Sequence, residues 1–216
     1  MKLVIGNKNY SSWSFRPWLL LTYHQVEFEE VRVALFSENY KAAITSLSGA
    51  GFVPILEDGD TTVWDSLAIC EYISETCLED KGWPLDRHDR SQARACSAEM
   101  HSGFPNIRNM MPMNVRASGR VIDITPEIEK EVARIDAIWT GLRTSYAVRG
   151  PWLFGEFSIA DCMYAPMVFR FKTYGINLSS ESRTYMDTVL AHPATQGWMH
   201  DALNETEVID WAEVGV

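Results

Sequence analysis

Three serines, Ser11, Ser12 and Ser14, stand where a short apolar strand gives way to a helix. The strand is residues 2–6, and Pro17, which is tolerated in a first helical turn, predicts a helix start near Ser12 to Ser14. The first N–H groups of a helix have no intrahelical partner and carry partial positive charge. Hydroxyls beside such groups can bind and stabilise an anion. The alternative is that the serines only cap the helix.

The elements that would position these serines alternate between strand and helix over the first 80 residues. We expect strands at 2–6, 28–34, 53–57 and 61–64, helices at 14–25 and 66–76, and an irregular or helical piece at 38–46. Glu57 to Asp60 is a hairpin turn signal between the last two strands. This order predicts a βαβ unit with a right-handed crossover, followed by a hairpin and a helix, which is an α/β domain.

Strand signals almost vanish beyond residue 80, and residues 81–85 look like a linker. Helices are expected at 87–111, 125–146, from Ser158 onward, at 182–190 and at 193–203. Thr125 followed by proline is a helix start, and Ser158 with Asp161 has the spacing of a capping box. The chain is therefore predicted to have an α/β domain at 1–80 and an all-α domain at 81–216.

Composition limits the classes of function. The net charge of −10 disfavours nucleic-acid binding, which needs a basic surface, and 46% hydrophobic residues favour a substantial core. No apolar run reaches the length of a membrane span, and no basic segment precedes an apolar run at the start, so we expect a cytoplasmic protein with no membrane partner. The four cysteines lack metal-ligand or C-x-x-C spacing, so we expect buried thiols and no metal.

Four motifs occur in a fixed order: Ser-Ser-x-Ser-x-Arg at 11–16, Gly-Phe-Val-Pro at 51–54, Asp65-Ser66, and the capping box at 158–161. Together they resemble the glutathione transferase superfamily, most closely its serine-type classes such as zeta. The resemblance covers the whole chain. It implies a thioredoxin-like N-terminal domain, a helical C-terminal domain, glutathione as cofactor and a homodimer.

The resemblance also implies roles for individual residues. Ser11 would donate a hydrogen bond to the glutathione thiolate, with Ser12 as the alternative because a slip of one residue at the helix start stays open. The Val53–Pro54 bond would be cis, and Asp65 with Ser66 would hold the γ-glutamyl group. The residues expected to bind glutathione are Ser11, Ser12, Phe15, Phe52, Val53, Pro54, Asp65 and Ser66. Arg16 is expected to have a structural role between the domains.

The second substrate would lie between the domains. The candidates for its pocket are Tyr10, Trp13, Phe104, Arg108, Met111 and Arg116. Arg108 and Arg116 could attract an acidic substrate, although solvated arginines and core packing of the apolar residues are the plain alternatives. Pro112, within a methionine-rich run, should kink or end the preceding helix.

Three functions follow from the resemblance. The first is a detoxifying glutathione transferase that conjugates glutathione to a small electrophile. The second is glutathione-dependent cis–trans isomerisation of a maleyl-type diacid, although Trp13 stands where the zeta pattern Ser-Ser-Cys-Ser has cysteine. The third, of a different class, is a non-catalytic binding or interaction protein on the same fold.

Overall fold

The computed structural model describes all residues from 1 to 216, and its N-terminal part is built on a four-stranded mixed sheet. The strands are β1 (Lys2–Ile5), β2 (Glu29–Arg32), β3 (Ile55–Asp58) and β4 (Thr61–Trp64). Their spatial order is β2-β1-β3-β4, with β1 and β2 parallel and the other two pairs antiparallel. The predicted βαβ unit and hairpin are therefore confirmed.

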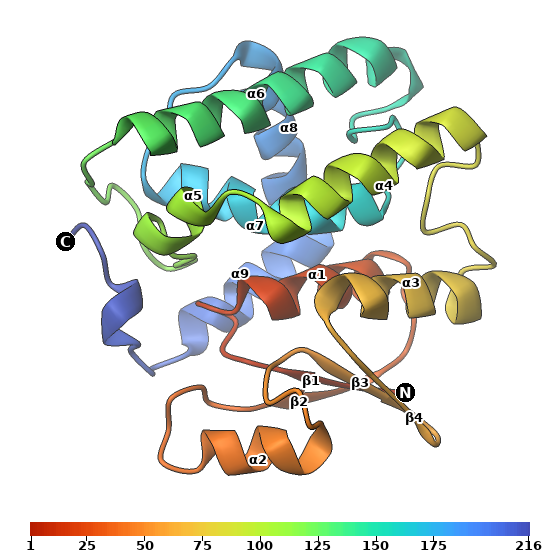
Figure 1. Cartoon of the computed structure of the whole chain (residues 1–216), viewed down its shortest axis with the longest axis vertical. Coiled ribbons are helices and arrows are strands. Elements are labelled where there is room, and N and C mark those ends of the chain that lie inside the picture. The colour runs from red at the N-terminus through yellow and green to blue at the C-terminus, as the bar shows by residue number, and fades with distance from the viewer.

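Helices cover both faces of this sheet, as Figure 1 shows. α1 (Ser12–Tyr23) and α3 (Ser66–Cys77) lie on the face toward the helical domain, and α2 (Tyr40–Leu47) covers the opposite face. Side chains of a strand alternate between faces, so neighbours in β1 enter different clusters. Leu3 joins the main core, whereas Val4 packs with Ile44 of α2.

The C-terminal part is helical throughout. It contains α4 (Arg87–Ser102), α5 (Pro105–Met110), α6 (Pro126–Tyr146), α7 (Ile159–Thr173), α8 (Ser180–Ala191) and α9 (Pro193–Asn204), with short 3₁₀ turns at Ala147–Arg149 and Asp210–Ala212. Nearly every residue of α7 is buried, and this helix packs against α1, α4 and α8. No helix has the length and apolar composition needed to cross a membrane.

The single helix predicted over 87–111 is wrong, because the structure divides it into α4 and α5. Gly103 ends α4, and a Cβ at this position would lie 2.7 Å from the carbonyl oxygen of Glu99. Phe104 then adopts a left-handed conformation with φ of 60°, and Pro105, which has no N–H to continue the ladder, begins α5. As expected, the helix ends just before Pro112.

The start of α1 at Ser12 agrees with the prediction, but the position of Pro17 does not. Pro17 is the sixth residue of the helix and lies in its second turn. Since proline has no N–H, the carbonyl of Trp13 loses its usual helical donor. The predicted caps are confirmed further along: the Thr125 side chain accepts from the first turn of α6, and Asp161 closes the capping box with Ser158.

One hydrophobic core runs across both parts of the chain. Phe15 of α1 is fully buried, and its ring lies 5.4 Å from that of Phe169 in α7 and 4.9 Å from that of Trp198 in α9. The helical part therefore fixes the position of α1, and with it the serines at its N-terminus.

Candidate active site

Ser11, Ser14 and Gly6 are joined by a chain of hydrogen bonds at the start of α1. Ser11 is the N-cap, and its Oγ accepts the backbone N–H of Ser14 at 3.4 Å. The two hydroxyl oxygens lie 2.7 Å apart, with Ser11 donating, and Ser14 Oγ accepts the backbone N–H of Gly6 at 3.1 Å. Both serines are buried. The end of β1 therefore holds the cap of α1 through Ser14.

Ser12, the first residue of α1, faces the helical domain. Its Oγ accepts a hydrogen bond from Arg170 of α7 at 3.3 Å, and its own hydroxyl proton has no acceptor in the chain. The backbone N–H of Trp13 also has no acceptor. Two donors at a helix N-terminus are thus free to bind an anion.

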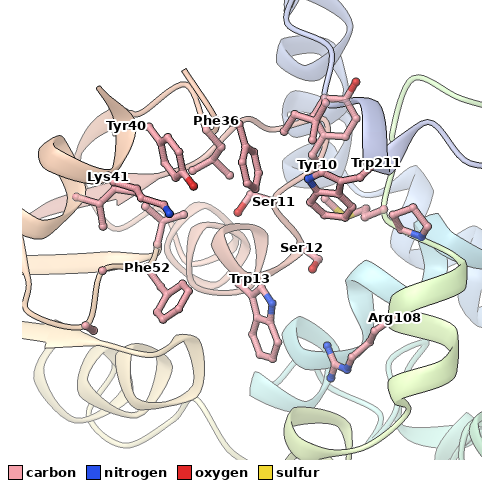
Figure 2. A pocket seen from close by; sticks show the side chains of 18 of the residues that line it. Tyr10, Ser11, Ser12, Trp13, Phe36, Tyr40, Lys41, Phe52, Arg108 and Trp211 are labelled. Carbon is pink, nitrogen blue, oxygen red and sulfur yellow. The ribbon is translucent and has the colours of Figure 1, made fainter. Parts of the chain in front are cut away.

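The serines open into a cavity of about 790 Å³ between the two parts of the chain. Its lining includes Tyr10, Ser11, Ser12, Trp13, Phe36, Tyr40, Phe52, Val53, Arg108, Arg170 and Trp211. A second cavity, of about 290 Å³, shares Trp13, Phe52 and Val53 with the first and continues to Asp65 and Ser66. Figure 2 shows Ser11 and Ser12 with Phe36, Tyr40 and Phe52 on one side and Arg108 on the other. The two cavities form a cleft of the size that binds small ligands.

Two arginines, Arg108 and Arg170, line this cleft, and a third, Arg16, is buried and donates to Ser66 in its lining. None of them forms an ion pair with a carboxylate. Burial lowers the pKa of Arg16 and of Arg170 to about 9, and burial also lowers the pKa of Arg108. The Nε atoms of Arg16 and Arg170 are buried without a partner. Buried charges without counterions are costly and point to an anionic ligand.

The indole of Trp13 partly offsets this charge. Its ring centre lies 4.3 Å from the guanidinium carbon of Arg16 and 4.8 Å from that of Arg108, both within cation–π range. Trp13, which stands where the zeta pattern has cysteine, thus helps to hold two arginines at the site.

Asp65 and Ser66 lie together at the N-terminus of α3. One carboxylate oxygen of Asp65 accepts two backbone N–H groups of the first turn at 2.9 and 3.2 Å, and the other lies 3.0 Å from His101 Nε2. Ser66 Oγ accepts from Arg16 at 3.1 Å. Asp65 has a φ of 78°, which is strained for a residue with a side chain and is typical of functional sites.

Val53 connects the two ends of the cleft. The Val53–Pro54 peptide bond is cis, in agreement with the resemblance. Neither the N–H nor the carbonyl of Val53 forms a hydrogen bond within the chain. These groups, with those of Trp13 and Ser12, give the cleft the free donors and acceptors that a peptide-like ligand needs. Phe52 is 77% exposed beside them.

Some predicted site residues lie elsewhere. Phe15 is in the core between the two parts of the chain, and Phe104 and Met111 are buried outside the lining of the cleft. Arg116 donates to Tyr10 Oη at 3.0 Å and to backbone carbonyls of the C-terminal segment, so its charge does not face the cavity. Of the six candidates for a second-substrate pocket, Tyr10, Trp13 and Arg108 line it.

Several residues that line the two cavities were not predicted from the sequence: Phe36, Tyr40, Lys41, His101, Arg170 and Trp211. Arg170 had a signal, since it is an isolated charge in the apolar stretch from 162 to 171. Phe36 and Trp211 had none, because they meet only when the end of the chain folds back.

The cysteines are not part of the site. All four are free; Cys70 and Cys162 are buried, and burial raises their pKa, so they are poor nucleophiles. No group of three or more His, Cys, Asp or Glu side chains could hold a metal ion.

Comparison with known proteins agrees with the fold and with the motifs. The family models "Glutathione S-transferase, N-terminal domain" and "Glutathione S-transferase, C-terminal domain" match residues 10–76 and 124–201. A probable maleylacetoacetate isomerase of Caenorhabditis elegans is 26% identical over 173 residues, 78% of either chain. Glutathione S-transferase F13 of Arabidopsis thaliana is 42% identical over 90 residues, 41% of either chain.

Solved structures share the fold over nearly the whole length. A glutathione transferase homologue from Burkholderia, with bound glutathione, has a TM-score of 0.73 at 21% identity and covers 94% of this chain and 98% of its own. A bacterial maleyl pyruvate isomerase of the zeta class has a TM-score of 0.68 at 22% identity and covers 96% of this chain and 100% of its own. The chain therefore belongs to the glutathione S-transferase family.

Proposed function

We propose that this protein binds glutathione in the cleft and transfers it to a small electrophile, acting as a cytoplasmic homodimer. Residues 1–80 would form the glutathione-binding domain and 81–216 the helical domain. Bound glutathione supplies the nucleophile, a thiolate. Thiols with an ordinary pKa are mostly protonated at neutral pH, so the protein has to stabilise the ionised form.

The observation that carries this proposal is the set of donors at the N-terminus of α1. The Trp13 N–H is free, and Ser11 and Ser12 stand beside it. Arg170 adds a positive charge through its hydrogen bond to Ser12. Each of these favours an anion over a neutral thiol, which lowers the pKa of the thiol.

Ser11 is the residue that we propose contacts the sulfur. The Ser11 hydroxyl donates to Ser14 Oγ at 2.7 Å. Because a hydroxyl can also accept, we propose that thiolate binding reverses this bond, so that Ser14 donates to Ser11 and the Ser11 proton turns to the sulfur. The resulting chain runs from the Gly6 N–H through Ser14 to Ser11, and successive hydrogen bonds of this kind strengthen one another.

The tripeptide would lie along the cleft from Ser11 to the N-terminus of α3. The free backbone groups of Val53 would pair with its middle residue, while Asp65 would accept from the γ-glutamyl ammonium. Ser66, through its hydroxyl and its backbone N–H, which has no acceptor in the chain, would bind the α-carboxylate. Exposed Phe52 would cover one side of the ligand.

Isomerisation of a maleyl-type diacid is a second candidate, and two arginines of the cavity favour it. Arg108 and Arg170 line the cavity without carboxylate partners, which suits a carboxylate on the second substrate. The similarity to a probable maleylacetoacetate isomerase points the same way.

Retention on immobilised glutathione, followed by turnover assays with an aryl halide and with a maleyl diacid, tests these proposals. We expect specific elution by free glutathione and turnover of at least one substrate, and the substrate that reacts decides between transferase and isomerase. Absence of glutathione binding would contradict both enzymes. Binding without turnover of either substrate would favour the non-catalytic alternative.

A further inference from the structure

A buried loop, residues 7–10, leads from β1 to Ser11. The carbonyl of Asn7 accepts the N–H of Tyr10 at 3.1 Å and the N–H of Ser11 at 2.8 Å, so the loop closes on itself as a tight turn. Ser11 is both the last residue of this hydrogen-bonded turn and the N-cap of α1. The position of the Ser11 side chain therefore follows the position of the loop.

Two N–H groups in the middle of this loop bind one carboxylate of the helical domain. Glu205 directly follows α9, and its two carboxylate oxygens accept the N–H of Lys8 at 2.7 Å and the N–H of Asn9 at 2.9 Å. The Glu205 side chain is 6% exposed, and Arg32 of β2 lies 3.3 Å from one of its oxygens. Hydrogen bonds to an ionised acceptor are the stronger kind, and engagement of both oxygens fixes the orientation of the carboxylate.

The side chain of Lys8 forms a second link between the loop and α9. It is 4% exposed, and its Nζ pairs with Asp201 of α9 at 2.6 Å and with Glu30 of β2 at 2.8 Å. Asp201 and Glu205 are four residues apart, so they are neighbours on one face of the helix end. The end of α9, a helix that packs beside α1 (Figure 1), thus holds the loop through two carboxylates.

Neither of these carboxylates reaches the cleft. Asp201 and Glu205 line a separate polar cavity of about 360 Å³, together with Lys8 and Arg32, and are absent from the lining of the two cavities that form the cleft. A contact between Glu205 and a ligand in the cleft is therefore excluded. Glu205 can act on such a ligand only through the loop or through its distant charge.

We propose that Glu205 is a positioning residue, which binds the N–H groups of Lys8 and Asn9 and so holds the Ser11 hydroxyl in place for the sulfur of glutathione. This inference rests on the proposed function and on the role proposed there for Ser11. In Glu205→Gln one acceptor oxygen becomes an NH₂ donor, which cannot bind a backbone N–H, so the loop loses one of its two hydrogen bonds. A small displacement of a positioned group has a large effect on the chemistry that it supports.

Loss of the charge and loss of the position have opposite effects on the bound thiol. Removal of the Glu205 charge alone would favour another anion nearby and would lower the pKa of the thiol. Displacement of Ser11 weakens a hydrogen bond to the thiolate and raises this pKa. We expect Glu205→Gln to raise the pKa of bound glutathione by roughly half a unit, part of the effect of one hydrogen bond to a charged group. Ultraviolet absorbance of the thiolate as a function of pH measures it.

Glu207→Gln is the matched control. Glu207 carries the same charge two residues further on and also pairs with Arg32, at 2.8 Å, but its carboxylate binds no N–H of the loop. This variant should leave the thiol pKa at the wild-type value or slightly below it. Asp201→Asn loosens the loop only through Lys8, so it should raise the thiol pKa by less than Glu205→Gln does, and it tests the proposal even where Glu205→Gln does not fold.

A double variant shows whether the effect passes through Ser11. Because coupled residues are not additive, Glu205→Gln should have no further effect on the thiol pKa when it is combined with Ser11→Ala. A shift of full size in the Ser11→Ala background would overturn the positioning role. A lower melting temperature with an unchanged or lowered thiol pKa in Glu205→Gln and Asp201→Asn would also overturn it, while glutathione binding by the wild type would leave the proposed function intact. Failure of the wild-type protein to bind glutathione would remove the proposed function and this inference with it.

Discussion

Arg170, in the last turn of α7, donates a hydrogen bond of 3.3 Å to the Oγ of Ser12, the first residue of α1. The guanidinium also donates to the carbonyls of Met111 and Arg108, so its orientation is fixed. A buried charge from the helical domain thus reaches the helix end that carries the serines of the other domain.

Removal of this charge should make bound glutathione less acidic. We expect Arg170→Met to raise the pKa of the bound thiol by roughly one unit, the lower end of the effect of an adjacent opposite charge. Arg170→Lys should keep much of the effect. The thiolate absorbance, followed as a function of pH, measures this, and an unchanged pKa in Arg170→Met would limit Arg170 to a structural role.

Ser14 is predicted to act through Ser11. In Ser14→Ala the Ser11 hydroxyl loses its 2.7 Å partner, so the pKa of the bound thiol should rise, but by less than in a variant that lacks Ser11 itself. The buried Gly6 N–H also loses its acceptor, which should cost about 1–3 kcal/mol of unfolding free energy. Urea denaturation and thiol titration of the same variant separate the two effects. A loss of stability with no change in the thiol pKa would show that Ser14 does not act on the thiol through Ser11.

Glutathione affinity should depend on His101, which pairs with Asp65. Burial lowers the pKa of His101, Asp65 raises it, and the net shift is downward, so His101 becomes protonated only below its ordinary range. The cation then competes with the ligand ammonium for Asp65. We expect affinity to fall roughly two- to fivefold as the pH drops below the ordinary range of a histidine pKa.

His101→Gln should flatten this pH dependence. His88→Gln, on the exposed side of the same helix, serves as the control. Its glutathione affinity should depend on pH as that of the wild type does. Identical profiles for His101→Gln and wild type would show that the pair does not influence binding.

Asp161 should make the protein more stable as the pH falls. An ordinary ion-paired carboxylate has the opposite effect. Burial raises the pKa of Asp161 to about 6, despite hydrogen bonds from Ser158, Leu153 and Tyr185. Between pH 6 and about 4, Asp161 therefore keeps its proton in the folded state but loses it in the unfolded state. The contribution of Asp161 to the free energy of unfolding increases as the pH falls through this range.

Comparison with Asp161→Asn isolates this contribution. The unfolding free energy of the wild type relative to the variant should be higher at pH 4 than at pH 7 by roughly 2–3 kcal/mol. Urea denaturation at both values measures it. A difference that stays constant, or that is larger at pH 7, would show that the folded Asp161 is ionised throughout.

Local patterns made much of the fold predictable. The short apolar run at residues 2–6, the proline after Thr125 and the spacing of Ser158 and Asp161 each report a physical requirement of a few neighbouring residues. The break between α4 and α5 was missed although Gly103 and Pro105 mark it in the sequence; only the left-handed conformation of Phe104 between them has no signature in residue type.

The site was only partly predictable, for a different reason. Ser11, Ser12, Val53 and Asp65 belong to short motifs and do line the cleft. Phe36 and Trp211 are far apart in sequence, and their contact depends on the carboxylate of Glu213 anchoring the C-terminal segment. No local stretch of the sequence predicts this contact.

Ultraviolet titration of glutathione bound to the wild type, to Ser11→Ala and to Ser12→Ala shows whether Ser11 stabilises the thiolate. We predict a bound thiol pKa below its ordinary value of about 8.5 in the wild type and a return toward that value in Ser11→Ala. Ser12→Ala should show a smaller rise. An unshifted pKa in the wild type, or a full loss of the shift in Ser12→Ala with none in Ser11→Ala, would contradict the account.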